Sequence, residues 1–232
     1  MSPPVVVLVA PSLPENVGAV ARVMANLGVR DLRLVAPRCD PADPRAMAVA
    51  TSGGDVLARS VIFPTLDAAL VGCTGAWAAS ALPKELQKEQ LSPRELGPRL
   101  GYDTTALVLG PEQNGLRYEE LDRCTGLVHI PTEPGARALN LAQAAGILLW
   151  EWRSAALNPS AAPPGRALRP APLAEQSALV DAVAAALLNV GYLSDPRRRV
   201  VALRNLRAAM LRPGFTRAEL RSLRGMIAAL AR

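Results

Sequence analysis

The sequence predicts an α/β fold with a mainly parallel sheet, followed by a small helical extension. Three observations support this prediction. Short apolar runs alternate with segments of helical periodicity over the first two thirds of the chain. A Pro- and Ala-rich stretch then interrupts the periodicity. Helical spacing returns in the last part of the chain, which is rich in arginine.

Six apolar runs have the length and composition of buried strands. Val5–Ala10 is the clearest, because it is continuously apolar and Pro11 follows it. The other predicted strands are Leu32–Ala36, Val61–Phe63, Gly75–Ser80, Ala106–Leu109 and Leu127–Ile130.

Apolar residues at helical spacing predict helices between these strands. Val17–Leu27 has this spacing and Gly28 follows it as a C-cap. Asn140–Arg153 has the strongest pattern. The shorter predicted helices are Ala42–Ala50, Leu66–Leu70 and Tyr118–Cys124. In such a fold the ligand is expected at the carboxyl ends of the strands.

The pattern predicts three segments. Residues 1–153 form the α/β domain, 154–174 a linker with five prolines, and 175–232 a basic helical extension. The helices expected in the extension are Glu175–Val190, Arg198–Leu211 and Thr216–Ala231. Thr216 and Glu219 have the spacing of a capping box at the start of the last helix.

The excess positive charge lies at the end of the chain. From residue 165 onward there are 12 basic and 4 acidic side chains, a net charge of +8, whereas residues 1–164 have a net charge of −2. This asymmetry indicates a tail that binds a polyanion such as RNA. A solvated helical face explains the charge alone equally well.

Several classes of protein are disfavoured. The three cysteines are far apart and the single His129 cannot complete a metal cluster, so no metal is expected and His129 is interpreted as structural. Signal-peptide and membrane-spanning patterns are missing, which favours a cytoplasmic protein. Gly-x-Gly-x-x-Gly after the first strand, Walker A and Gly-x-Ser-x-Gly sequences are also missing.

Three loops follow predicted strands at the same edge of the sheet. They are Pro11–Gly18, with Arg22 in the helix behind it, Gly110–Leu116, and Ile130–Asn140. Each has an ordinary explanation, because glycines supply turns and Asn16 or Asn140 can cap a helix. Their common position instead favours one binding site.

These loops carry a family resemblance. Asn16–Arg22 resembles the first motif of the SpoU/TrmH methyltransferases, Asn-x-Gly-x-x-x-Arg. Gly110–Leu116 resembles the second motif, Gly-x-Glu-x-x-Gly-Leu, and Leu139-Asn140 resembles the third, Ser-Leu-Asn-x-x-x-Ala. The motifs occur in the family's order over residues 3–153. Gly191–Leu193 and Arg217–Ile227 are similar to the C-terminal extension of the TrmJ branch, which methylates the ribose of nucleotide 32 in tRNA.

The resemblance implies a SPOUT fold with a C-terminal trefoil knot, a homodimer whose active sites use both subunits, and S-adenosylmethionine as cofactor. It implies a tRNA substrate methylated on a ribose 2′-hydroxyl. The implied cofactor-binding residues are Ala79, Ser80, Ala81, Gly110, Ile130, Ala138, Leu139 and Asn140.

The resemblance also implies the catalytic residues. The sulfonium makes the methyl group electrophilic, so the protein must align the ribose hydroxyl and help to remove its proton. Arg22 matches the family's essential arginine, and phosphate clamping suits it better than a role as base. Asn16 and Glu112 are expected to position Arg22 or the substrate, and Asn140 to hold the cofactor loop. The expected RNA-binding residues are Arg22, Arg197, Arg198, Arg199, Arg204 and Arg207.

The chain departs from the family pattern at two positions. Leu82 replaces an arginine and Ala138 replaces the serine of the third motif. Lys84 or Lys88 could supply the missing charge at the first position. Two alternatives therefore stay open: methylation of ribosomal RNA, and an RNA-binding protein with impaired catalysis.

Overall fold

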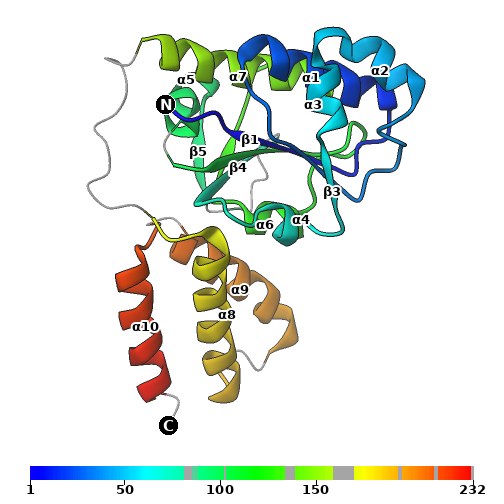
Figure 1. Ribbon diagram of the computed structural model, residues 1–232. Coiled ribbons are helices and arrows are strands. Elements are labelled where there is room, and N and C mark those ends of the chain that lie inside the picture. The colour runs from blue at the N-terminus through cyan, green and yellow to red at the C-terminus, as the bar shows by residue number, and fades with distance from the viewer. Residues whose placement is uncertain are drawn as a thin grey trace.

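A seven-stranded parallel sheet between two layers of helices forms the first part of the molecule (Figure 1). The structure is a computed structural model that describes residues 1–80, 86, 88–101, 103–133, 139–158, 170–192, 195–211 and 214–230, without the side chains of residues 197, 229 and 230. The strand order is β3-β2-β1-β6-β4-β7-β5, and every pairing is parallel. The predicted α/β fold with a parallel sheet is confirmed.

The strands agree closely with the predicted runs. They are β1 (Val5–Val9), β2 (Leu32–Val35), β3 (Val61–Phe63), β4 (Gly75–Ala79), β5 (Glu89–Leu91), β6 (Thr105–Leu109) and β7 (Gly126–Val128). β5 was not predicted, because Glu89-Gln90-Leu91 is short and polar. It pairs with β7 at the edge of the sheet.

The helices of the α/β part are α1 (Pro14–Leu27), α2 (Pro44–Ala50), α3 (Gly54–Ala58), α4 (Leu66–Ala69), α5 (Pro93–Leu100), α6 (Tyr118–Arg123) and α7 (Leu141–Leu157), with a short 3-10 turn at Thr51–Gly53. α5 was not predicted either, because it contains Pro93 and Pro98 and proline is unfavourable inside a helix. Its signal was the capping box of Ser92 and Glu95, which the structure forms.

The central strand β1 explains the arrangement of layers. Val6 and Leu8 face a core shared with α1, α5 and α7, whereas Val5, Val7 and Val9 face a second core on the other side of the sheet. Alternate side chains of a strand point to opposite faces, so a strand covered on both faces must be apolar throughout. Figure 1 shows α1, α2, α3, α5 and α7 over one face, and α4 and α6 under the other.

Three further helices pack below α4 and α6 (Figure 1). They are α8 (Leu173–Asn189), α9 (Pro196–Leu211) and α10 (Arg217–Leu230). Leu173, Val180 and Leu211 join the second core, and the Leu173 amide donates to the Cys73 carbonyl over 2.7 Å. α7 and α8 both extend into the stretch predicted as linker, and residues 159–169 lie outside the described part of the chain. No described helix is long and apolar enough to cross a bilayer.

The buried amine of Lys88 supports the end of α6. Its Nζ donates to the carbonyls of Asp122 (3.1 Å) and Cys124, which the helix itself leaves without partners. The proposal that Lys88 replaces a charge at the cofactor loop was therefore wrong, because its amine is committed under α6. Lys84 lies outside the described residues.

Burial lowers the pKa of Lys88 from 10.5 to about 8. The unfolded chain therefore binds this proton more tightly than the folded chain, and folding becomes more favourable as pH rises between these two values. The gain is up to about 3 kcal/mol. We expect the free energy of unfolding of the wild type, measured in urea, to rise relative to that of Lys88→Met between pH 7 and pH 10. A constant difference would contradict the buried, protonatable amine.

Candidate functional site

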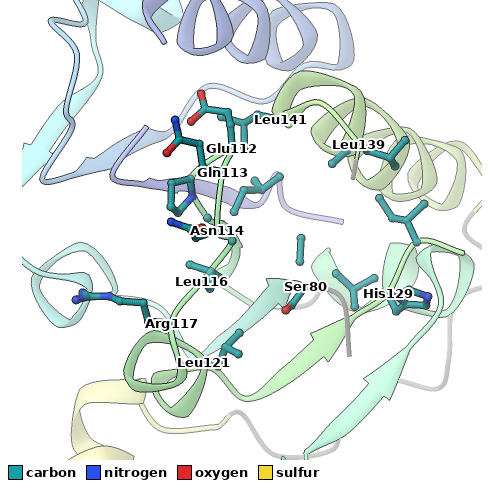
Figure 2. A pocket seen from close by; sticks show the side chains of 18 of the residues that line it. Ser80, Glu112, Gln113, Asn114, Leu116, Arg117, Leu121, His129, Leu139 and Leu141 are labelled. Carbon is teal, nitrogen blue, oxygen red and sulfur yellow. The ribbon is translucent and has the colours of Figure 1, made fainter. Parts of the chain in front are cut away.

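A pocket of about 740 Å³ opens at the carboxyl ends of β4, β6 and β7 (Figure 2). Figure 2 shows the loop from Glu112 to Leu116 along one side, and His129 and Leu139 across from it. Of the predicted cofactor residues, those that line the pocket are Ala79, Ser80, Gly110, Ile130 and Leu139. Asn140 follows Leu139 but is not in the lining, and Ala81, Leu82 and Ala138 lie outside the described residues.

Two glycines shape the loop after β6. A side chain at Gly110 would come within 2.4 Å of the Leu116 backbone nitrogen, so only glycine permits this close approach. Gly115 has a φ of +63°, and its amide donates to the Pro111 carbonyl over 3.0 Å. The loop therefore folds back on itself and presents backbone groups to the pocket.

A hydrogen-bonded chain joins the three loops that carry the motifs. The backbone amide and the hydroxyl of Ser12 donate to Glu112 Oε2 at 3.2 and 2.8 Å. Asn16 Nδ2 donates to Glu112 Oε1 at 2.7 Å, and Asn140 Nδ2 donates to Asn16 Oδ1 at 2.9 Å. Residues more than 90 positions apart in sequence thus meet at one edge of the sheet.

The chain of bonds has a single consistent direction. An ionised carboxylate only accepts, so Glu112 requires the amino group of Asn16 to face it. The carbonyl of Asn16 then faces Asn140, whose own carbonyl accepts from the Ala142 amide at 2.9 Å. The orientation of each amide is thereby fixed by its neighbour.

Glu112 is held in its ionised form. Partial burial alone would raise its pKa, but hydrogen bonds from Asn16, from the backbone and from Ser12 outweigh that effect and lower the pKa below its ordinary value. At neutral pH the group is therefore a fixed acceptor and not a proton donor. The stability that it contributes is lost only as pH falls through this lowered pKa.

The two asparagines differ in their relation to helix ends. Asn140 caps α7, as the ordinary interpretation predicted, and forms a capping box with Gln143. Asn16 does not cap α1, because α1 begins at Pro14, before the predicted start at Val17. Asn16 instead lies in the first turn, is only 7% exposed, and uses its side chain for Glu112 and Asn140.

Arg22 lies apart from this network. It is on an exposed position of α1 and is not part of the pocket lining. Within the described residues it forms no hydrogen bond or ion pair, neither with Glu112 nor with Asn16. Its guanidinium is thus available to a group outside the chain.

Some lining residues were missed from the sequence. Tyr118, at the start of α6, lines the pocket, and so do Gln113 and Asn114, whose loop was expected at the site although neither residue was given a role. His129 was interpreted as structural; its backbone amide does donate to the Leu91 carbonyl, but the residue also lines the pocket (Figure 2). Its position directly after β7 was the signal, because that is the ligand-binding end of the strand.

The predicted RNA-binding arginines of α9 fall into two groups. Arg204 pairs with Asp122 at 3.2 Å and Arg207 with Asp181 at 2.6 Å, and both side chains are largely buried. Arg198 is 89% exposed, with Asp195 at 3.6 Å, and Arg199 belongs to the same helical turn. The side chain of Arg197 lies outside the described part of the chain.

Comparison with known proteins gives consistent matches. Residues 3–150 match the model of the SpoU rRNA Methylase family. The chain is 34% identical to the tRNA (cytidine/uridine-2′-O-)-methyltransferase TrmJ of Cronobacter sakazakii, over 97% of this chain and 94% of that protein. The crystal structure of TrmJ from Z. mobilis ZM4 has a TM-score of 0.87 and 30% identity, with 99% of both chains covered.

A more distant structure contains the cofactor. The AdoMet-bound rRNA methyltransferase from Sinorhizobium meliloti has a TM-score of 0.55 and 25% identity, over 66% of this chain and 56% of that one. The matches to TrmJ of Cronobacter sakazakii and of Z. mobilis also extend through α8, α9 and α10, which lie beyond the region that the family model covers.

Proposed function

Because this chain belongs to the SpoU methylase family, we propose that it is an S-adenosylmethionine-dependent tRNA methyltransferase that acts on the ribose 2′-hydroxyl of a cytidine or uridine. The observation that carries this proposal is the full-length match to TrmJ, since it includes the helical extension as well as the family's common domain. By the same resemblance the target is nucleotide 32. A tRNA substrate also implies a cytoplasmic enzyme.

The pocket suits the cofactor. Its volume lies within the range of about 300–1,000 Å³ that is typical of small-molecule sites. Ala79, Ser80, Gly110, Ile130 and Leu139 would hold S-adenosylmethionine, together with Ala81, Ala138 and Asn140. The bound group supplies an electrophilic methyl on its sulfonium. We also propose the trefoil knot of the family.

The catalytic arrangement requires two subunits. Arg22 is exposed and separate from the pocket of its own chain, so it can reach the pocket of a second copy. There its guanidinium would bind the RNA phosphate and stabilise charge that develops on the 2′-oxygen. Asn16, Glu112 and Asn140 would hold the three loops in the geometry that this transfer needs.

An apolar stripe on α7 supports the homodimer. Ile147, Trp150 and Leu157 follow one another at near-helical spacing and are exposed, Trp150 by 55%. We expect Trp150→Glu to convert the dimer to monomers, because a charge would be buried in the interface. Sedimentation velocity would measure this. Val190→Glu, which changes an exposed residue after α8, is the control. A Trp150→Glu variant that sediments as the wild type would exclude this face.

We retain the division into an α/β domain (1–153), a linker (154–174) and a basic extension (175–232) as a proposal, with RNA contacts on the extension. Arg198 and Arg199 would bind phosphates, whereas Arg204 and Arg207 already hold α9 in place. A variant that lacks residues 165–232 would expose the core that Leu173, Val180 and Leu211 cover, so its loss of RNA binding would not locate the RNA contacts.

Reversing one exposed charge is a sharper test of the extension. We expect Arg198→Glu to weaken tRNA binding. The plot of log affinity against log salt should become less steep by roughly one unit of slope, because one phosphate contact is lost. Filter binding across a salt series would measure this. Arg59→Glu makes the same change at an exposed position of the α/β domain. Equal slopes for the two variants would place the RNA elsewhere.

The proposed function is tested by mapping the product. Purified protein and S-adenosylmethionine are incubated with unmodified tRNA or with unmodified ribosomal RNA, and the RNA is cleaved by a ribonuclease into fragments whose 2′-O-methylated nucleotides are located by mass spectrometry. We expect a methyl group at nucleotide 32. Methylation of ribosomal RNA alone would favour the first alternative. Tight binding of tRNA and cofactor without methyl transfer would favour the second alternative, an RNA-binding protein with impaired catalysis. The departures from the family pattern at Leu82 and Ala138 are the reason for this alternative.

A further inference from the structure

Helix α6 lies between the cofactor pocket and the C-terminal helices. Its first residue, Tyr118, lines the pocket. The same ring is contacted from α9, where the Arg204 guanidinium carbon is 4.5 Å from the ring centroid. One aromatic side chain therefore contributes to the pocket and to the contact with the extension.

Arg204 contacts two residues of α6. Besides the ring of Tyr118, it contacts Asp122, with Nε 3.2 Å from Oδ2. Tyr118 and Asp122 are four residues apart and share one face of the helix. The Arg204 and Asp122 side chains are 14% and 17% exposed, so water weakens this ion pair less than a surface pair. A planar guanidinium can stack and pair at once, which a lysine amine cannot.

The contact between α6 and α9 is incompletely satisfied. Asp122 Oδ1 is buried and has no hydrogen-bond partner among the described residues. Such an atom costs about 1–3 kcal/mol. Arg198, which is exposed, and Arg199 in the same turn, both of which we assign to RNA phosphates, precede Arg204 on the same helix by about one and a half turns.

We propose that Arg204 is a positioning residue that couples the RNA-binding extension to the cofactor pocket. RNA bound to the first turn of α9 fixes that helix, Arg204 fixes Tyr118, and Tyr118 sets the wall of the pocket. Cofactor and tRNA consequently bind with positive cooperativity. This inference rests on the proposed function, because it needs both ligands to bind. Since such coupling is reciprocal, either ligand can report it.

The test is a ratio of cofactor affinities. The Kd of S-adenosylhomocysteine, which cannot donate a methyl group, is measured by calorimetry on the full-length protein with and without saturating unmodified tRNA. In the wild type we expect tRNA to tighten binding by at least about fivefold. In Arg204→Ala we expect the ratio to fall to near one, while each ligand still binds alone. A purely structural loss would weaken both affinities without removing the ratio.

Matched variants keep the test decisive. Arg217→Ala breaks an exposed ion pair with Glu175 inside the extension and should preserve the ratio. If Arg204→Ala does not fold, Tyr118→Leu and Tyr118→Phe replace it, because only the second keeps the stacked ring. Loss of the ratio in the leucine variant alone supports the proposal. A wild-type ratio near one, or a normal ratio in Arg204→Ala or Tyr118→Leu, overturns the coupling but not the function. A wild type that binds neither ligand refutes the proposed function itself.

Discussion

Replacing Arg22 with alanine is expected to lower the rate of methyl transfer by about 100- to 1,000-fold, the usual effect of removing one preorganised group that stabilises transition-state charge. The affinity for the cofactor should not change, because Arg22 does not line the pocket of its own chain and is proposed to bind the RNA phosphate, not the cofactor, in the pocket of a second copy. Single-turnover transfer of a labelled methyl group to tRNA measures the first quantity, and calorimetry measures the second.

The matched control for this change is Arg30→Ala. Arg30 is also exposed and lies just beyond the end of α1. Its replacement therefore removes the same charge from a neighbouring position. Arg22→Lys should fall between alanine and the wild type, since it keeps the charge but loses the planar fork that binds phosphate. If Arg22→Ala transfers methyl groups within a few-fold of the Arg30→Ala rate, the proposed role of Arg22 is wrong.

The change from Asn16 to aspartate is expected to have the largest effect on stability. It places a carboxylate oxygen where an amide now donates to Glu112 Oε1 over 2.7 Å. Two carboxylates at this distance cannot both stay ionised, so one takes up a proton and its pKa rises. We expect a loss of about 3 kcal/mol at pH 7 in the free energy of unfolding, together with loss of activity.

The pH dependence gives this second prediction its signature. A pair that holds a proton in the folded state is destabilised as pH rises above the carboxylate's ordinary pKa, because the unfolded chain releases that proton first. The deficit of Asn16→Asp should therefore be smaller at pH 5 than at pH 7 in urea titrations. Asn26→Asp is the control on the same helix, since Asn26 is exposed and its carbonyl accepts from Ser52. Equal stability of the two variants would show that the bond to Glu112 is unimportant.

The sequence predicted the parts of the fold that a strong local pattern encodes. β1 was found because all of its residues are buried between two layers, and α7 because its apolar face repeats over many turns. β5 and α5 were missed for the opposite reason: three residues of mixed polarity and a helix with two prolines carry little periodicity. These elements depend on the pairing with β7 and the packing against α7, which no local pattern reports.

The candidate site shows the same limit. Asn16, Glu112 and Asn140 were all singled out, yet which atom of each faces which neighbour follows only from the fold. The positive charge of the extension was even less informative about which arginines bind RNA. The composition of α9 could not separate Arg204, which is buried against α6, from Arg198, which extends into solvent. Residues 81–85 and 134–138 lie outside the described chain, so Ala81 and Ala138 stay predictions.

Helix α7 connects the pocket, at Asn140, to the exposed apolar stripe that contains Ile147 and Trp150. The Asn140 side chain fixes the start of the helix beside the pocket, and the same rigid rod carries Ile147 and Trp150 about 10–15 Å farther along its axis. The length of this helical segment therefore sets the distance between the pocket and the proposed dimer contact. A single residue inserted between Asn140 and Ile147 would turn the apolar stripe by about 100° relative to the pocket, so the proposed dimer contact would no longer face the same way as the pocket requires.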